Sequence, residues 1–531
     1  MTADLTAQPG PELADPDLDE PRTDTLEVVP GRFDVLRSAR VSGRAVDLGV
    51  LVVALVVGSW LRLADLGGVG VNSDEAVYAG QAASLAGNDH FLANFPIVRA
   101  HPLLFQMLIA PWYADGVPDT AGRYASALFG IGTIALVFAL GHLLYGRRAG
   151  AIAALLVAVM PFAVILNRQV LLDGPMTFFT TAALVCLALL AKTENGRWLV
   201  AAGALLGLAT LTKETAVIMV MAVFVFLSLV PRFWRPKRYV VLAVVAALGL
   251  AATYPIATAL AGGGSRGQSY IVWQLSRRPN HDFLFYLTDI PVAIGVLTIV
   301  TAGVGLVLLR RRSSWREVLL LAWIIVPFVF FEVWPVKGFP YLLVLAPAVA
   351  VLAARACAAL IDRSPRRAWS TLTGVVLTAA LVLVTFVPSA QLVIDPVASP
   401  TAGAGGSPGG REAGIWIDAN VPSGAKVMTI GPTMANIVMY YSGRRADALS
   451  VSPNPLHRNP SYSPIINPDH AVRAGTYRYL VWDAYSAARS PSFSSRLLGM
   501  VRKYGGRVVH SESAVFDGTM REVVVIYEVK R

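Results

Sequence analysis

The sequence predicts a polytopic α-helical membrane protein, with about 11 transmembrane helices and a C-terminal extracytoplasmic α/β domain. Mean hydropathy is +0.57, and charged residues make up only 15% of the chain, whereas about 25% is typical of soluble globular proteins. The apolar residues are gathered in long runs separated by short basic clusters. Beyond residue 412, short runs rich in β-branched and aromatic residues replace them, which indicates a second fold class.

Eleven apolar runs are candidates for membrane-spanning helices, because a helix needs about 20 apolar residues to cross a bilayer. They lie at residues 46–66, 122–144, 149–166, 174–191, 198–212, 215–230, 239–261, 291–309, 318–334, 341–361 and 369–388. We expect them to form one transmembrane domain over residues 45–390.

The basic clusters predict how the chain is oriented in the membrane. Arginines precede the first run, and Arg or Lys clusters then occupy every second loop. Because cytoplasmic loops are enriched in Lys and Arg, we expect a multi-pass protein of the cell membrane whose N-terminus is cytoplasmic and whose residues after 388 are extracytoplasmic. The net charge of +11 lies in these clusters and not on one face, so it does not indicate a nucleic-acid partner.

The segments outside the membrane have distinct compositions. Residues 1–44 are expected to be a disordered cytoplasmic tail, acidic at first and then basic, since residues 1–30 hold eight acidic groups and one arginine. Residues 391–412 form a predicted Gly/Pro/Ser linker, and residues 413–531 the α/β domain. The two cysteines, Cys186 and Cys357, lie inside apolar runs and are interpreted as packing residues.

Ionisable residues gather at the predicted outer ends of the apolar runs. A secondary transporter usually carries such groups near the membrane midplane, where substrate and coupling ions bind. The pattern therefore favours an enzyme with an outward-facing site, and a transporter or flippase of lipid-linked glycans is the alternative. The outer polar residues are Asp74, Glu75, His101, Arg123, Asn167, Arg168, Asp173, Lys213, Glu214, His281, Asp282 and Lys337.

The first outer loop contains the acidic pair Asp74-Glu75, which opens a predicted helix with Ser73 as its cap. One interpretation is that the pair complements the helix dipole. The other is that one carboxylate acts as a general base and takes the proton of an acceptor hydroxyl. Both stay open from the sequence.

Basic residues and a histidine follow in the later outer loops. His101 begins a short amphipathic stretch that we expect at the membrane interface. Arg168, Lys213 and Lys337 could snorkel or form ion pairs, or they could stabilise the charge of a departing phosphate.

Six motifs together resemble the GT-C glycosyltransferases, over about residues 45–390. They are SDEAVYA, HPLL, GRYASALFGIG, NRQVLLDGPMTFF, GLATLTKET and KGFPYLLVLAP. The resemblance is strongest to the branch with dolichyl-phosphate-mannose protein mannosyltransferases and the bacterial aminoarabinose transferase of lipid A. It implies a GT-C fold and an inverting transfer of a monosaccharide from a polyprenyl-phosphate sugar to an extracytoplasmic hydroxyl of a protein, glycan or lipid.

The resemblance also implies roles for individual residues. Asp74 would be the base, with Glu75 orienting it or the acceptor. The donor phosphate would be held by Arg168, Lys213 and Lys337, and further substrate-binding candidates are Tyr78, His101, Arg123, Asp173 and His281.

A divalent metal is implied through His281 and Glu75. However, the chain departs from the aminoarabinose enzymes at Val77 and Ala100, where those enzymes have other residues. The resemblance therefore leaves both the metal and the donor sugar open.

Overall fold

The structure is a computed structural model that describes residues 33–114, 116, 118–234, 237–260, 270, 272–309, 314–362, 368–395, 407–516 and 519–530. The acidic tail, the Gly-rich part of the predicted linker and the arginines at 310–312, 363, 366 and 367 lie outside these residues. Residues Asp47–Arg531 form one compact unit, separate from Met1–Val46.

Each predicted apolar run coincides with a helix or with a bent pair of helices. Six helices are long and apolar enough to cross a membrane, or up to eight spans exist if each bent pair counts as one, among the described residues. The number of eleven crossings is therefore not confirmed. The helices are α1 (Phe33–Leu63), α5 (Ala121–Tyr145), α6 (Arg147–Val159), α7 (Pro161–Asn167), α8 (Asp173–Thr193), α9 (Arg197–Thr212), α10 (Val217–Leu229), α11 (Lys237–Leu260), α13 (Phe285–Ile294), α14 (Val296–Leu308), α15 (Trp315–Val333), α16 (Ala346–Ile361) and α17 (Ala368–Ile394).

Two of the expected continuous spans are broken. Helices α6 and α7 meet at 59°, and α13 and α14 at 94°. Pro161 begins α7 and has no amide hydrogen, and Met160 before it is extended, as a residue preceding proline prefers. At the second break Gly295 has φ +102°, a conformation that only glycine adopts readily. Runs 149–166 and 291–309 are thus bent pairs and not single straight helices.

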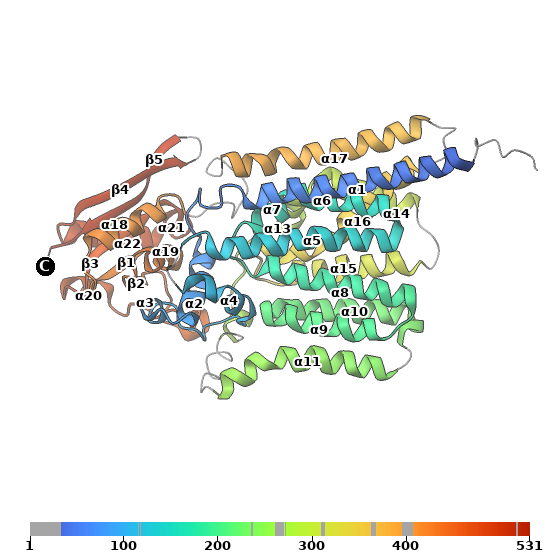
Figure 1. Cartoon of the computed structure of the whole chain (residues 1–531). Helices are drawn as coiled ribbons and strands as arrows, with labels where there is room; N and C mark the ends of the chain where they lie inside the picture. Colours follow the sequence, from blue (N-terminus) through green and yellow to red (C-terminus); the bar gives the residue numbers. More distant parts are fainter. Residues whose placement is uncertain are drawn as a thin grey trace, which may run out of the picture. The chain divides into compact units, whose positions relative to one another are not determined.

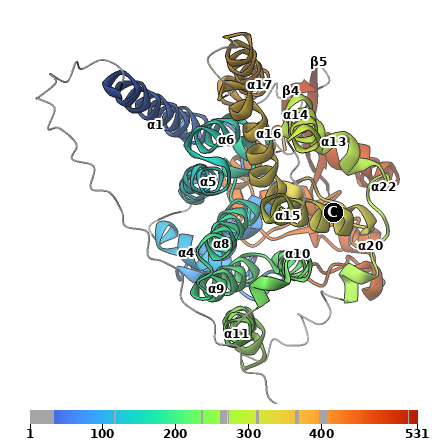
Figure 2. The same cartoon turned by 90° about the vertical axis from the view of Figure 1, so that its right-hand side faces the viewer.

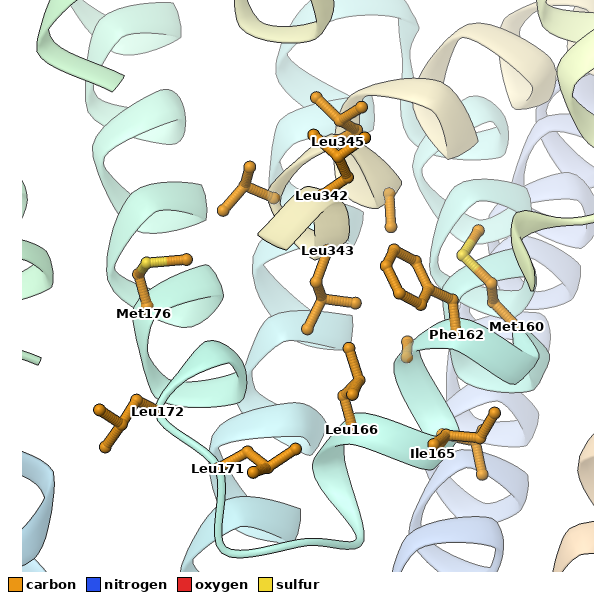
Figure 3. Packing of buried hydrophobic residues seen from close by; sticks show 14 of the residues in the cluster. Met160, Phe162, Ile165, Leu166, Leu171, Leu172, Met176, Leu342, Leu343 and Leu345 are labelled. Carbon is orange, nitrogen blue, oxygen red and sulfur yellow. The ribbon is translucent and has the colours of Figure 1, made fainter. Parts of the chain in front are cut away.

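Buried apolar side chains hold the helices together. Helix α8 packs between α5 and α9, and α9 packs on α11, an arrangement visible from the side in Figure 1 and end-on in Figure 2. Figure 3 shows Leu343 of η4 (Phe339–Leu345) near Phe162 and Leu166 of α7, with Met176 of α8 in the same buried cluster. These three elements also adjoin loops that carry polar residues, so packing in the apolar cluster fixes the positions of the ends of those loops.

The loop between α1 and α5 folds into short helices: α2 (Ser73–Leu85), α3 (Asp89–Leu92), α4 (Leu104–Ile109) and η1 (Ala110–Tyr113). The expected cap residue of α2 is wrong by one position. Asn72 is the cap, and its side chain accepts hydrogen bonds from the amides of Asp74 and Glu75. The Glu75 carboxylate in turn accepts from the Asn72 amide, which completes a capping box.

The C-terminal region is an α/β fold, and its strands lie beyond residue 412, where the sequence predicts short β-rich runs. Its sheet has the order β2-β1-β3-β5-β4; β2, β1 and β3 are parallel, and β5 and β4 are antiparallel neighbours. The division of the chain into domains stays a prediction. The elements are α18 (Gly410–Asn420), β1 (Lys426–Thr429), α19 (Pro432–Ser442), β2 (Ala446–Ala448), α20 (Pro468–Arg473), β3 (Tyr477–Asp483), α21 (Ala484–Arg489), α22 (Pro491–Lys503), β4 (Arg507–Phe516) and β5 (Thr519–Glu528).

Candidate active site

A cavity of about 630 Å³ lies where the polar loops of the helical part meet the C-terminal region. Its walls come from the start of α2, the connections before α8 and after α9, the segment 270–285, the segment before and within η4, and several C-terminal loops. Its polar lining residues are Asn72, Ser73, Asp74, Tyr78, His101, Gln169, Asp173, Lys213, Tyr270, Gln274, Arg277, His281, Lys337, Tyr341, Ser407, Thr433, Asn459, Tyr485 and Arg489.

Asp74 presents a free carboxylate to this cavity. Its side chain is exposed to the cavity interior and makes no hydrogen bond or ion pair with any residue that the structure describes. The enclosing protein desolvates the carboxylate and raises the pKa of Asp74, while the positive charges of Lys213 and His101 oppose this effect. A carboxylate with a raised pKa and no partner is suited to accept a proton.

Glu75 points the other way, into the protein interior, with a side chain that is 1% exposed. Its Oε1 accepts hydrogen bonds from Arg123 Nε at 2.7 Å and from the Val170 amide at 2.9 Å. Its Oε2 accepts from Arg123 Nη2 at 2.8 Å and from the Asn72 amide at 3.0 Å. Glu75 does not line the cavity, and its placement indicates that it anchors the start of α2.

Arg123, at the start of α5, is the partner of Glu75 and is also fully buried. Its remaining donors bind the carbonyl oxygens of Leu66, Val69 and Gly70 at 2.6 to 3.0 Å. Arg123 therefore fixes the segment that leads from α1 into α2, and it does not reach the cavity.

Arg168 also lies away from the cavity. It donates to the carbonyl oxygens of Leu61, Ala64 and Asp65 at 2.7 to 3.1 Å, and so it caps the C-terminal end of α1. Because its donors bind these carbonyls, Arg168 stabilises the fold and is not placed to bind a ligand in the cavity.

Lys213 and Asp173 form a buried ion pair on the cavity wall. The Lys213 ammonium donates to both Asp173 oxygens, at 2.7 and 2.8 Å. It also lies 4.7 Å from the centre of the Tyr341 ring, a cation–π distance. The predicted phosphate ligand is thus present in the cavity, already paired with a carboxylate.

Lys337 lines the cavity from the segment before η4. Its ammonium donates to the Glu332 carbonyl at 2.7 Å and lies 3.3 Å from the Glu332 carboxylate. The rings of Phe283 and Tyr286 lie 5.2 and 5.1 Å from it. Like Lys213, this lysine is held in place by an acid and by aromatic rings.

His101 lines the cavity beside Asp74. Its Nδ1 lies 2.9 Å from the Glu214 carboxylate, and its Nε2 lies 3.4 Å from the Tyr270 hydroxyl. The rings of Tyr78 and Tyr270 meet it edge-on. Glu214 and the two tyrosines therefore fix the orientation of this imidazole.

His281 is exposed to the cavity and stacks on Phe285, with ring centres 4.1 Å apart. Burial lowers the pKa of His281, and the charge of Arg489 adds to the effect. A metal site made of Glu75 and His281 does not fit this geometry, because both Glu75 oxygens accept from Arg123. No group of three or more His, Cys, Asp or Glu able to hold a metal ion occurs in the described part of the chain.

Two arginines of the cavity wall were missed by the sequence analysis. Arg277 stacks on Trp273 at 4.7 Å, and Arg489 of α21 donates to the Tyr485 hydroxyl at 2.6 Å. Neither pairs with a carboxylate of the described residues. The signal for Arg277 was its position in RRPNHDFLFYL, four residues before His281; for Arg489 the sequence offered none, because only the fold brings α21 to the cavity.

The comparisons with known proteins agree with this architecture. The family of dolichyl-phosphate-mannose-protein mannosyltransferases matches residues 100–257, less than a third of the chain. The Bacillus subtilis protein YycA, described as a candidate mannosyltransferase, is 32% identical over 143 residues. That match covers 26% of this chain and only 21% of YycA.

Solved structures match almost the whole chain. ArnT from Cupriavidus metallidurans has a TM-score of 0.61 both in the apo state and bound to undecaprenyl phosphate, with 17% and 16% identity, and these matches cover 92% and 91% of this chain and 98% of ArnT. The chain has the GT-C fold.

Further GT-C matches come from Archaeoglobus fulgidus. Its oligosaccharyltransferase in complex with Zn and sulfate has a TM-score of 0.56 at 16% identity, covering 89% of this chain and 73% of that chain. Its AglB in complex with an inhibitory peptide and a dolichol-phosphate has a TM-score of 0.57 at 16% identity, covering 91% and 74%. The GT-C fold expected from the sequence resemblance is confirmed, as is the multi-pass membrane architecture.

Proposed function

We propose that this GT-C chain is an inverting glycosyltransferase that moves a monosaccharide from a polyprenyl-phosphate sugar to an acceptor hydroxyl on the extracytoplasmic side. The observation that carries the proposal is the free carboxylate of Asp74, which faces a cavity whose other walls hold several cations. Relatives of the same fold bind undecaprenyl phosphate and a dolichol-phosphate, which supports a lipid-linked donor.

The proposed reaction is one displacement at the anomeric carbon. The acceptor hydroxyl oxygen attacks this carbon from the face opposite the phosphate, and its proton passes to the Asp74 carboxylate. The bond from the anomeric carbon to the phosphate oxygen breaks, and its electron pair leaves with the lipid phosphate. The raised pKa of Asp74 suits this role, because a stronger base takes the hydroxyl proton more readily.

The departing phosphate needs cations, and we assign this role to Lys213, Lys337 and Arg277. Each lysine already has a carboxylate partner, Asp173 or Glu332, which reduces the positive charge available to a ligand. Arg277 has no carboxylate partner in the described residues, so its charge remains available to the phosphate. Its Nη1 donates to Gln274 Oε1 at 3.2 Å, which leaves its other donors for a ligand. Arg168 is left out of this set because its donors hold α1.

The test uses purified full-length protein with radiolabelled polyprenyl-phosphate mannose and an envelope extract as acceptor. Wild-type protein should transfer the label, and Asp74→Asn should lower kcat by about a hundredfold or more while donor binding persists. Asp89→Asn is the matched control, because Asp89 also opens a short helix of the same loop but lies outside the cavity. The kcat of the wild type should fall as the pH is lowered through a value above that of an ordinary aspartate.

Two outcomes would contradict the proposal. If Asp74→Asn kept its kcat within tenfold of the wild type, the assignment of the base would be wrong. If the protein moved the labelled lipid between the leaflets of a vesicle without any sugar transfer, the chain would be a transporter of lipid-linked sugars.

A further inference from the structure

The segment that leads into Asp74 is held from two sides. Arg123 of α5 binds the carbonyl oxygens of Leu66, Val69 and Gly70 from the helical side. The opposite side is held by residues of the C-terminal region, more than 300 positions away in the sequence.

Three side chains of α18 and α19 make these distant contacts, and we call Arg411, Asn436 and Tyr441 the clasp. Arg411 Nη2 donates to the Gly67 carbonyl at 2.8 Å. The Tyr441 hydroxyl accepts from the Val71 amide at 2.8 Å. Asn436 Nδ2 donates to the Ser73 hydroxyl at 3.0 Å.

Asp119, in the loop before α5, connects two members of the clasp. Its Oδ2 accepts a hydrogen bond from the Tyr441 hydroxyl at 2.7 Å and lies 3.2 Å from Arg411 Nε. Both side chains of this ion pair are largely buried, with 16% of Asp119 and 23% of Arg411 exposed. Asp119 therefore couples Tyr441, through a hydrogen bond, with Arg411, through an ion pair, while Asn436 makes its contact with Ser73 separately.

The fit around Gly70 is close. A Cβ atom at Gly70 would lie 3.0 Å from Arg411 Cβ and 3.3 Å from the Tyr441 hydroxyl. An alanine at this position would crowd the clasp, whose side chains would have to shift by a few tenths of an ångström.

The clasp brackets the residue that sets the direction of Asp74. Its contacts at Val71 and Ser73 lie on either side of Asn72, whose side chain caps α2 and accepts from the Asp74 amide at 2.9 Å. A shift of Asn72 would therefore shift the first turn of α2 and the carboxylate that extends from it.

We propose that the clasp makes the C-terminal α/β region a positioning element of the active site, which holds Asp74 in the orientation needed for proton transfer. This inference rests on the proposed function of Asp74. The members of the clasp are positioning residues, because they contact the segment around Asp74 and not its carboxylate. Since a misplacement of about 1 Å can lower a rate about a hundredfold, loss of one clasp contact should reduce catalysis measurably.

The experiment compares Tyr441→Phe with Tyr477→Phe. Each variant removes the hydroxyl of one tyrosine of the C-terminal region. That hydroxyl donates to Asp119, in the loop before α5, at 2.7 Å in the case of Tyr441, and to Asp447 at 2.8 Å in the case of Tyr477. Tyr477 has no contact with the segment before Asp74, so it controls for a general loss of stability. A third variant, Gly70→Ala, crowds the clasp with a Cβ atom 3.0 Å from Arg411 Cβ.

We expect Tyr441→Phe and Gly70→Ala to lower kcat about tenfold with unchanged donor binding, and Tyr477→Phe to leave kcat unchanged. The acidic limb of the kcat profile should move to lower pH in the first two variants, because a loosened Asp74 gains water and its raised pKa falls toward the ordinary value. Hydrogen exchange of the peptide over residues 66–76 should become faster in these two variants alone.

The exchange measurement does not depend on activity, so the two hypotheses can fail separately. If the wild type transferred no sugar but Tyr441→Phe still exchanged faster over residues 66–76, the proposed function would be refuted and the positioning contact would stand. The inference would be overturned if activity depends on Asp74 but Tyr441→Phe keeps the exchange rate, the kcat and the pH profile of the wild type.

Discussion

Replacing Glu75 by Gln is expected to destabilise the protein by about 3–5 kcal/mol, the usual cost of breaking a buried ion pair at one partner. The structure shows why an almost isosteric change is so costly. All four partners of the Glu75 carboxylate are donors: two nitrogens of Arg123 and the amides of Asn72 and Val170. Whichever way the Gln amide turns, its NH2 group faces two donors, and Arg123 keeps a buried charge without a counter-ion.

The assay is thermal and chemical unfolding of the purified protein in detergent, with transfer activity normalised to the folded fraction. Asp469→Asn is the control, because it breaks an ion pair with Lys503 whose side chains are 44% and 58% exposed. We expect a clear loss of stability for Glu75→Gln and none for the control. An unchanged midpoint together with a large loss of kcat would refute the reasoning, since it would place Glu75 in the chemistry and not in the scaffold.

Two further predictions separate the roles of the arginines and test the sidedness of the membrane domain. Arg277→Ala should weaken binding of the polyprenyl-phosphate donor about tenfold or more with an unchanged melting temperature. Arg168→Ala should instead lower the melting temperature, since it removes the donor of the Leu61 and Ala64 carbonyls at the C-terminal end of α1. The opposite pattern would return Arg168 to the phosphate site. In a variant that lacks the two native cysteines, a cysteine that replaces Ser407 should react with an impermeant thiol reagent in intact cells. A cysteine that replaces the exposed Asn195 should not react. The reverse labelling would place the cavity in the cytoplasm.

The apolar runs could be read from the sequence because the bilayer imposes a length and a composition on each helix. The positions of the breaks at Met160 and Gly295 could not be predicted from hydropathy in the same way. Both runs stay apolar across the break, and hydropathy does not report the direction of the backbone. Proline and glycine at these positions were the available signals.

The candidate site was predictable in its residue types but not in their directions. Asp74 and Glu75 are neighbours in sequence, yet successive side chains of a helix are turned by about 100°. One therefore faces the cavity and the other the protein interior. Arg168 and Lys213 looked equivalent as outer cations, and only the packing shows that the first binds helix carbonyls and the second lines the cavity.

The separation between Val71 and Tyr441 has a consequence for how the protein is made. The two residues are 370 positions apart, which corresponds to roughly 20–70 s of synthesis at about 5–20 residues per second. The segment before Asp74 thus leaves the ribosome long before the side chains that will support it. During that interval the inserted helices can supply Arg123 but not Tyr441 or Asn436. A chain interrupted after its last apolar helix would remain in the membrane with only one side of this segment held.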